Sequence, residues 1–272
     1  MVSLICDGPS TNFAVGAKVG ASLTTENMKP VFTHQSRDDW VVNIIFDAAH
    51  MLKLMRNTIA EKGILTHYAG KQIRWQHIKD LYELQNKEGL KAANKLKRSH
   101  VEWYQQQMKI SLAAQSLSRS VVNALEFVST DLKLPQLSDV AATVKFFRMI
   151  DRLFDILNSQ NRFAKEFKSV MKPENEKILR PFLGEVKGYL IGLKLNGILL
   201  HQSPRKTTVL RFLATITSVI TIYNEFVATK YISYLSTYRL SLDHIELTFN
   251  VVLSRGRWNN NPTACQYRAA YR

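Results

Sequence analysis

The sequence predicts a mostly helical α+β protein in which a large helical block lies between two pieces of an α/β unit. Strand-like runs occur early, where "MVSLIC" ends at Asp7 and "WVVNIIF" ends at Asp47. Helical patterns dominate from residue 60 to residue 235. One amphipathic helix and a basic tail follow. The α/β unit is therefore either incomplete or closed by this terminal segment across the block.

The order strand, acid, helix occurs twice in the first part of the chain. "GPSTN" follows Asp7 with turn chemistry, and "AAHMLKLMRNTI" continues from Asp47 with helical character. In open α/β sheets, ligands bind outside the carboxyl ends of the strands, so both acids are placed to face such a crevice. Each could equally be a helix cap or a turn former, because Asp is favoured at both.

The helical block contains several separate patterns. "IRWQHIKDLYELQNKEG" predicts one helix, and "HVEWYQQQMKISLAAQSLSRSVVNALEFV" predicts a longer one. "LSDVAATVKFFRMIDRLFDILNS" predicts a helix that begins at a Ser138 cap. "VKGYLIGLKLNGILL" fits a helix or a strand poorly, because its glycines weaken both. "VLRFLATITSVITIYNEFVATKYI" predicts a mostly buried helix rather than a membrane span, because Arg211, Asn224 and Glu225 interrupt it.

The composition is strongly basic, with 37 Lys and Arg against 22 Asp and Glu and a net charge of +15. This balance favours a polyanionic partner, either nucleic acid or an anionic membrane surface, although a basic protein with no such partner has the same composition. Two cysteines, Cys6 and Cys265, exclude a disulfide framework and a CxxC zinc site. The start of the chain lacks the features of a signal peptide.

The terminal helix begins in "SLDHIELTFN". Its apolar side chains recur at helical spacing and comprise Leu242, Ile245, Phe249 and Val252. Ser241 can cap the helix, and Asp243 lies in the first turn, where the helix dipole favours an acid. Glu246 lies on the polar side, one turn after Asp243. Local pattern alone fits either a solvated acid or a ligand at the rim of a site.

The sequence contains no Walker A, GxSxG, HExxH or GxGxxG motif. An acid set remains, comprising Asp7, Asp47, Asp243 and Glu246. Mg²⁺ is held in proteins by one or two carboxylates together with water and substrate phosphate oxygens. Two such ions can activate the attacking oxygen and stabilise the leaving oxygen in phosphodiester chemistry. Acids at strand ends and on a late helix suit that chemistry, but as a pattern they are not specific.

Six segments in order resemble P-element-type DNA transposases, including the THAP-domain transposases of animals. They are "ICDGPSTNFAVGAKVGA", "NIIFDAAHMLKLMRNTI", "MKISLAAQSLSRSVVNAL", "FDILNS", "SLDHIELTFN" and "GRWNNNPTACQYRAAYR". The resemblance implies an RNase H-like catalytic domain that is split by an all-helical, GTP-binding insertion. The implied domains are residues 1–57 for the first catalytic piece, 58–236 for the insertion and 237–272 for the final catalytic piece.

The resemblance also implies Mg²⁺-dependent catalysis by a DDE acid triad. Asp7 matches the second Asp and Glu246 matches the Glu, so both are expected to be catalytic residues and metal ligands. The family's first Asp lies upstream of the match, as does its zinc-coordinating THAP domain, and family members usually continue beyond "AAYR". We therefore expect a chain truncated at both ends, with an incomplete triad, that does not cut DNA by itself.

For the nucleotide, the resemblance implies that Asp155, Asn158 and Asp243 recognise guanine. A carboxylate can accept hydrogen bonds from the N1–H and the 2-amino group of guanine, an arrangement that adenine does not offer. Phosphate contacts are expected from three lysines, namely Lys95, Lys97 and Lys109. Alternatively, Asp155 pairs with a neighbouring Arg on its helix and the lysines form a solvated face.

The segment "FDAAHMLKLMRN" matches a further family motif directly after a core strand. We expect Asp47, close to His50, to have a structural function or to support a metal ligand rather than to belong to the triad. Lys53 and Arg56 follow on the same helix. They either contact DNA phosphates or are solvated.

The resemblance thus predicts a P-element-like transposase that cleaves DNA and transfers strands, with GTP as a structural cofactor. The expected partners are transposon-end and target DNA and GTP, with no membrane, in the nucleus; whether the chain forms a homo-oligomer stays open. One alternative is a domesticated or decayed derivative that binds GTP or DNA without catalysis. Another is a helical protein–protein interaction module.

Overall fold

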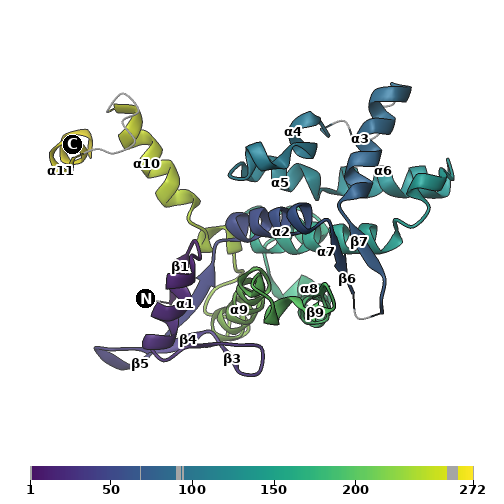
Figure 1. Ribbon diagram of the computed structural model, residues 1–272. Helices are drawn as coiled ribbons and strands as arrows, with labels where there is room; N and C mark the ends of the chain where they lie inside the picture. The colour runs from purple at the N-terminus through teal and green to yellow at the C-terminus, as the bar shows by residue number, and fades with distance from the viewer. Residues whose placement is uncertain (1, 68, 90–92, 94, 256–262, 272) are drawn as a thin grey trace.

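The computed structural model describes residues 2–67, 69–89, 93, 95–255 and 263–271. The chain begins with a three-stranded sheet in the order β1-β5-β4, built from β1 (Ser3–Cys6), β4 (Val31–His34) and β5 (Arg37–Phe46) (Figure 1). β1 pairs parallel to β5, and β4 pairs antiparallel to it. β2 (Ser22–Leu23) and β3 (Met28–Lys29) form a separate two-stranded sheet. The early α/β pattern of the sequence is confirmed.

The first helix packs on the buried half of β5, whereas the second continues from β5 and packs mainly against helices from later in the chain. α1 (Ser10–Lys18) stacks Phe13 on Phe46, with ring centroids 5.1 Å apart. α2 (Ala48–Lys62) follows β5 directly and is buried along most of its length. Two strand-to-helix transitions therefore stand side by side, which places their connecting acids at one edge of the sheet.

α9 (Lys206–Ile222) lies far from β5 in the sequence and packs against it. β4 begins at Val31, opposite Asn43, so the end of β5 has no strand partner on that side. Hydroxyl groups of α9 replace it. The Phe46 amide donates to Thr215 Oγ1 at 2.9 Å, and Ser218 Oγ donates to the Ile44 carbonyl at 2.6 Å. The predicted buried helix is confirmed, and its hydroxyl residues complete a sheet edge.

The segment between α2 and α9 is mainly helical but not all-helical, which corrects the prediction. A four-stranded sheet of order β7-β6-β8-β9 lies within it. Its strands are β6 (Ile64–Thr66), β7 (Gln72–Arg74), β8 (Lys194–Leu195) and β9 (Ile198–Leu199). The β8–β9 turn is formed by Asn196 and Gly197, both with positive φ, as two-residue hairpin turns require. The ambiguous segment thus ends one helix and then forms a hairpin.

The long helix predicted from "HVEWYQQQMKISLAAQSLSRSVVNALEFV" is wrong, because the segment is divided into short pieces. They are α4 (Arg98–Val101), the 3₁₀ turn η1 (Trp103–Gln106), α5 (Ile110–Ser116) and α6 (Arg119–Thr130). Lys109 and Ser118 have extended backbones that interrupt the helical path. The Ser118 hydroxyl donates to the Gln115 carbonyl, a local bond that competes with helix continuation.

The core of the helical block is centred on α7 (Ala141–Leu157), whose apolar side chains are largely buried. The predicted Ser138 cap is wrong, because Ser138 ends a 3₁₀ turn and bonds the Pro135 carbonyl while α7 starts after Val140.

The remaining elements of the block are α3 (Gln76–Glu88), η2 (Pro135–Leu137), η3 (Glu166–Lys168), α8 (Pro173–Ile191), η4 (Leu200–Gln202) and the π-helical η5 (Tyr223–Val227). No helix in the described part of the chain is long and apolar enough to cross a membrane.

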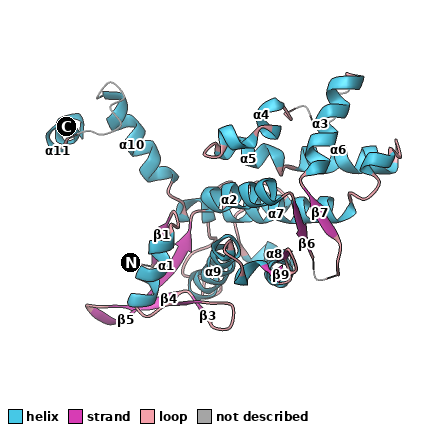
Figure 2. Cartoon of the chain, viewed as in Figure 1, coloured by secondary structure: helices cyan, strands magenta, loops and turns pink. Residues whose placement is uncertain are grey.

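The C-terminal segment leaves the body of the protein. After η6 (Thr237–Leu240), the helices α10 (Asp243–Arg255) and α11 (Ala264–Tyr271) extend away from the other elements (Figures 1 and 2). The stripe on α10 is only partly covered, since Val252 is buried whereas Ile245 is 55% exposed and Phe249 47% exposed. Part of the "GRWNNNPTACQYRAAYR" motif falls on 256–262, which lie outside the described residues.

Candidate catalytic and nucleotide-binding sites

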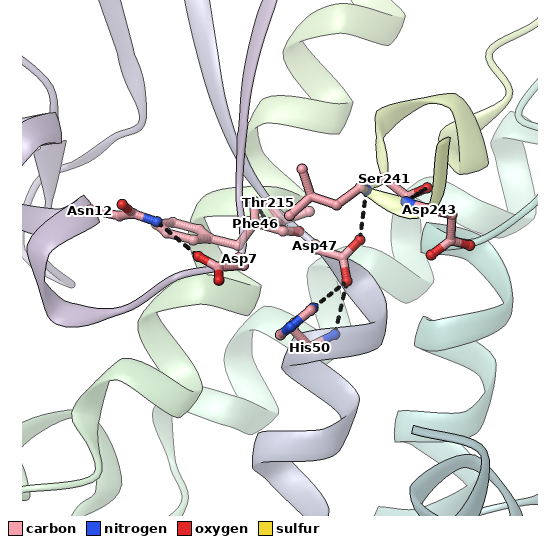
Figure 3. Close-up of polar contacts among 9 residues, drawn as sticks. Asp7, Asn12, Phe46, Asp47, His50, Thr215, Ser241 and Asp243 are labelled. Carbon is pink, nitrogen blue, oxygen red and sulfur yellow. Dashed lines mark hydrogen bonds and ion pairs between the residues drawn. The ribbon is translucent and has the colours of Figure 1, made fainter. Parts of the chain in front are cut away.

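The two strand-end acids lie on adjacent parallel strands. Cys6 is in register with Phe46, and the Asp47 amide donates to the Cys6 carbonyl at 2.9 Å. Asp7 and Asp47 therefore project from the same edge of the sheet (Figure 3). Asp7 is exposed, and its carboxylate accepts a hydrogen bond from Asn12 Nδ2 at 3.4 Å.

Asp47 is buried and joins two distant segments. Its carboxylate accepts hydrogen bonds from the His50 amide at 2.9 Å, the His50 ring at 3.0 Å and the Leu242 amide at 3.0 Å (Figure 3). Burial alone raises the pKa of this carboxyl, but these hydrogen bonds outweigh it and hold the pKa below its usual value. Asp47 thus caps α2 and fixes the backbone directly before α10.

Lys53 lies on α2, within electrostatic range of Asp7, Asp47 and Glu246. The carboxylates of Glu246, Asp47 and Asp7 raise its pKa, in that order of strength, while burial has the larger opposite effect and lowers the pKa overall. One buried ammonium is therefore within electrostatic reach of both Asp7 and Glu246. The fold brings these two sequence-predicted residues, from opposite ends of the chain, to one region.

Asp7 and Glu246 are the two carboxylates of this region that a metal ion could bind. Among the described residues, no group of three or more His, Cys, Asp and Glu side chains has the arrangement of a metal site. Asp7 and Glu246 alone still fit Mg²⁺, because this ion is commonly held by one or two carboxylates and completes its shell with water and phosphate oxygens. Their assignment as catalytic residues and metal ligands stays a prediction.

A cleft of about 570 Å³ opens beside Asp7. Its lining includes His50 and Lys53 from α2, Trp103 and Met108 from the segment around η1, and Arg211 from α9. Sequence reasoning missed Arg211 as a site residue and used it only to exclude a membrane span. The available signal was a single Arg within a long apolar stretch, since a buried Arg needs a specific partner.

Arg56 does not fit either of its predicted environments. Its side chain is fully buried, and its guanidinium donates to the Gln106 carbonyl at 3.0 Å and to the Asn57 side chain at 2.7 Å. Burial lowers its pKa to about 10. Arg56 is therefore neither solvated nor free to contact DNA, and it fixes the segment after η1 on α2.

A second cleft, of about 810 Å³, contains part of the predicted nucleotide site. It is lined by Asp155 and Lys95 together with seven charged residues that sequence reasoning missed, among them Asp151, Arg119, Lys165 and Lys168. The signal for Asp151 was its position one turn before Asp155 on α7. The predicted ion pair between Asp155 and an Arg of its own helix does not occur among the described residues.

Two acids of this second cleft, Asp151 and Asp155, have raised pKa values. Burial, and then the charge of Asp155, raise the pKa of Asp151 to about 6. Burial also raises the pKa of Asp155, and the positive charges of Lys168 and Arg119 partly oppose this effect. A carboxylate pair desolvated in this way is suited to accept hydrogen bonds from a buried polar ligand.

The other predicted nucleotide contacts lie elsewhere. Asn158 is the C-terminal cap of α7, one turn after Asp155. Asp243 lies at the start of α10 near Asp47, and burial followed by the Asp47 charge raises its pKa. Lys97 and Lys109 are exposed and line neither cleft. The structure brings Asp155 and Lys95 together and does not gather all six predicted residues in one cavity.

Comparison with known proteins finds matches to two family models in different parts of the chain. Residues 49–170 match the family model described as "TNP-like, GTP-binding insertion domain", and residues 238–272 match "TNP-like, RNase H C-terminal domain". The chain is 28% identical over 279 residues to DNA transposase THAP9 of Homo sapiens and 22% identical over 273 residues to the Transposable element P transposase of Drosophila melanogaster. The chain belongs to the P-element-type transposase family.

The family fold is seen in a solved relative as well. The chain matches the Drosophila P element transposase strand transfer complex with a TM-score of 0.84 and 23% identity over 99% of its length. This confirms the predicted fold class, a partial RNase H-like domain with a large insertion. The present chain spans 30% of the length of the human relative, 34% of the length of the Drosophila relative and 58% of the length of the solved chain.

Proposed function

We propose that this chain is the part of a P-element-like transposase that supplies Asp7 and Glu246 to a Mg²⁺-dependent DNA-cleaving and strand-transferring centre. The observation that carries this proposal is geometric: Asp7 ends the strand next to Asp47, and the Asp47 carboxylate accepts a hydrogen bond from the Leu242 amide directly before the helix that contains Glu246. Two acids from opposite ends of the sequence are thus connected to the same edge of the sheet, where Asp7 lines a cleft. Membership of the transposase family makes DNA the partner and the nucleus the compartment in this proposal.

Each residue has a distinct task in the proposed centre. When bound, Mg²⁺ would activate the attacking oxygen and stabilise the leaving one. Asp7 and Glu246 hold the ion, and Asp47 positions the start of α10 through the Leu242 amide. Because the Asp47 carboxylate is occupied by His50 and the Leu242 amide, this proposal assigns two carboxylates to the ion, one fewer than the acid triad that the resemblance implies. We therefore propose that the 272-residue chain alone does not cleave DNA.

Metal binding by the purified chain tests the two carboxylates. Mn²⁺, used as a paramagnetic substitute for Mg²⁺, should bind the unaltered chain, and Asp7→Asn or Glu246→Gln should weaken binding at least several-fold by removing one charged ligand. Electron paramagnetic resonance of free Mn²⁺ measures this directly. Asp39→Asn, which removes an exposed acid paired with Arg37, is the control. Equal Mn²⁺ affinity in all four proteins would refute the assignment.

We also propose that GTP binds the second cleft as a structural cofactor. The matched insertion-domain model is named for GTP binding, and Asp155 lies in this cleft with Lys95, Arg119 and Lys165. In this proposal Asp155 accepts the N1–H and 2-amino hydrogens of guanine, and the basic side chains contact the phosphates.

Calorimetry with GTP and ATP tests the nucleotide proposal. The chain should bind GTP in preference to ATP, and Asp155→Ala should remove most of that preference. Asp139→Ala, at an exposed acid of the same helical block, should leave GTP binding intact. Absence of GTP binding by the unaltered, folded chain would refute the proposal and favour a protein–protein interaction module.

A further inference from the structure

Arg211 reaches the catalytic region from α9 and contacts the backbone next to Asp7. A Cβ atom placed on Gly8 would lie 2.6 Å from Arg211 Nε and 2.8 Å from its Cζ. Gly8 also has a φ of +91°, which side chains other than glycine rarely adopt. The residue after Asp7 must therefore be glycine for the guanidinium to occupy this position.

Lys53 and Arg211 are two buried cations that lack carboxylate partners. Each is only 6% exposed, and both line the cleft beside Asp7. Within the described ranges, no carboxylate lies within 4.0 Å of either cationic group, and Arg211 Nε has no hydrogen-bond partner. A buried charge without a partner is costly, so such a pair is expected to meet an anion that enters the cleft.

The segment after η1, which lines part of the cleft, is attached to α2 by hydrogen bonds. Arg56 and Asn57 donate to the Gln106 and Gln107 carbonyls, at 3.0 and 3.2 Å respectively, and so attach the segment after η1 to α2. Met108 in this segment is 75% exposed and Trp103 is partly buried. The cleft is thus lined by two cations, by apolar side chains of a segment attached to α2, and by Asp7.

A simpler alternative is that the two cations only neutralise the acids. The charge of Asp7 does act on Arg211, and the three carboxylates act on Lys53. No direct ion pair forms among the described residues, however, and a metal held by Asp7 and Glu246 would neutralise these acids itself. The cations would then remain available to an anionic ligand next to the metal.

We propose that Lys53 and Arg211 form a two-cation clamp for a backbone phosphate of the DNA strand next to Asp7. This inference rests on the proposed function and names the residues that position the strand at that site. A phosphate on a nucleotide has similar chemistry, and the experiment below separates the two sources. Arg211 contributes a planar donor group and Lys53 a point charge, a combination suited to phosphate oxygens.

The test compares Lys53→Met and Arg211→Gln with the unaltered chain. Binding of a fluorescent DNA duplex is followed by anisotropy over a range of salt concentrations. Each substitution should weaken binding several-fold and should lower the slope of log affinity against log salt by about one, as expected for one lost phosphate contact. Lys62→Met and Arg180→Gln remove surface cations that pair with Glu61 and Glu176, and they should change the slope less.

Thermal unfolding of the same proteins separates a clamp from a structural neutraliser. Lys53→Met removes a desolvated charge at nearly constant volume, so a clamp predicts unchanged or higher stability together with weaker DNA binding. Lower stability with unchanged DNA binding would overturn the clamp. If Arg211→Gln does not fold, Arg211→Lys takes its place and should retain the slope better than Lys53→Met does.

GTP and inorganic phosphate are measured in parallel. Affinity for GTP should not change in either variant, because the clamp and the second cleft share no lining residue. Loss of GTP binding with unchanged DNA binding would assign the cations to the nucleotide and overturn the clamp. An unchanged salt slope in both variants would also overturn it and leave the proposed metal site standing. No DNA binding by the unaltered chain would overturn both.

Discussion

At the scale of single residues, the acids of this chain have different environments that follow from their positions. Asp7 is exposed at the end of β1, whereas Asp47, one strand away, is buried and accepts three hydrogen bonds. Asp151 is partly buried near another acid, and these two effects outweigh a hydrogen bond from the Arg119 backbone, so its pKa rises to about 6. Donors stabilise an ionised carboxylate, whereas burial and a like charge destabilise it.

The raised pKa of Asp151 gives a prediction for stability. Because the folded protein holds this proton more tightly than the unfolded chain, stability should fall as pH rises from the ordinary pKa of 3.8 to about 6. Asp151→Asn should therefore stabilise the protein at pH 7 by about 1–2 kcal/mol, after allowance for solvent screening, and by much less near pH 4. Urea unfolding at the two pH values measures the difference.

Asp131→Asn is the matched control, since Asp131 is an exposed acid at the end of α6. Its effect on the free energy of unfolding should be small at both pH values. An Asp151→Asn protein that is less stable than the unaltered chain at pH 7 would contradict the prediction.

At the scale of elements, α9 connects the inserted block to the catalytic sheet. Its hydroxyl groups bond the end of β5 that has no strand partner on that side, and its Arg211 reaches the backbone beside Asp7. The threonines and serine that break up this apolar segment therefore have a structural explanation. They satisfy backbone groups that a neighbouring strand would otherwise have to satisfy.

Thr215→Val tests this explanation at constant side-chain volume. The substitution leaves the buried Phe46 amide without its 2.9 Å acceptor, so the free energy of unfolding should fall by about 1–3 kcal/mol. Thr221→Val provides the control, because the Thr221 hydroxyl bonds only the Thr217 carbonyl of its own helix. Denaturant unfolding should show the larger loss for Thr215→Val; equal losses would argue against the edge-satisfying contact.

At the scale of the whole molecule, the two candidate sites are joined by a short path of hydrogen bonds. α7 carries Asp155, and the residues just after it bond the turn that precedes α10. The Ser159 amide donates to Thr237 Oγ1 at 3.1 Å, and Ser236 Oγ donates to the Ser159 carbonyl at 3.0 Å. The helix that carries Glu246 begins a few residues later.

This path predicts that a nucleotide at Asp155 stabilises the start of α10. GTP should slow amide hydrogen exchange over residues 237–246, because ordering the end of α7 also orders η6. Hydrogen exchange with mass spectrometry compares the chain with GTP, with ATP and without nucleotide. Thr237→Val, which removes the hydroxyl bonded to Ser159, should reduce the effect of GTP. Unchanged exchange in this segment upon GTP binding would contradict the coupling.

Much of the architecture follows from local pattern in the sequence. The two strands that end in Asp7 and Asp47 are correctly predicted, as are the helix after Asp47 and the buried α9. The sequence did not predict that the long helical pattern is divided into α4, η1, α5 and α6. Its periodicity favours one helix, but the extended backbones of Lys109 and Ser118 interrupt that helix. The hairpin of β8 and β9 was not predicted either, although the Asn196–Gly197 dipeptide is a sequence signal for a two-residue hairpin turn.

The sequence by itself determined the secondary structure around the acids, the basic charge and, through ordered motifs, the transposase family. Only the tertiary structure decided which charges share a site. It brought Glu246 and Asp7 within electrostatic range of Lys53, placed Arg211 against Gly8, and put Asp155 in a cleft with Lys95 while leaving Lys97 and Lys109 in solvent. The physical reason is that these contacts depend on long-range packing and burial, which the short-range periodicity of a chain does not encode.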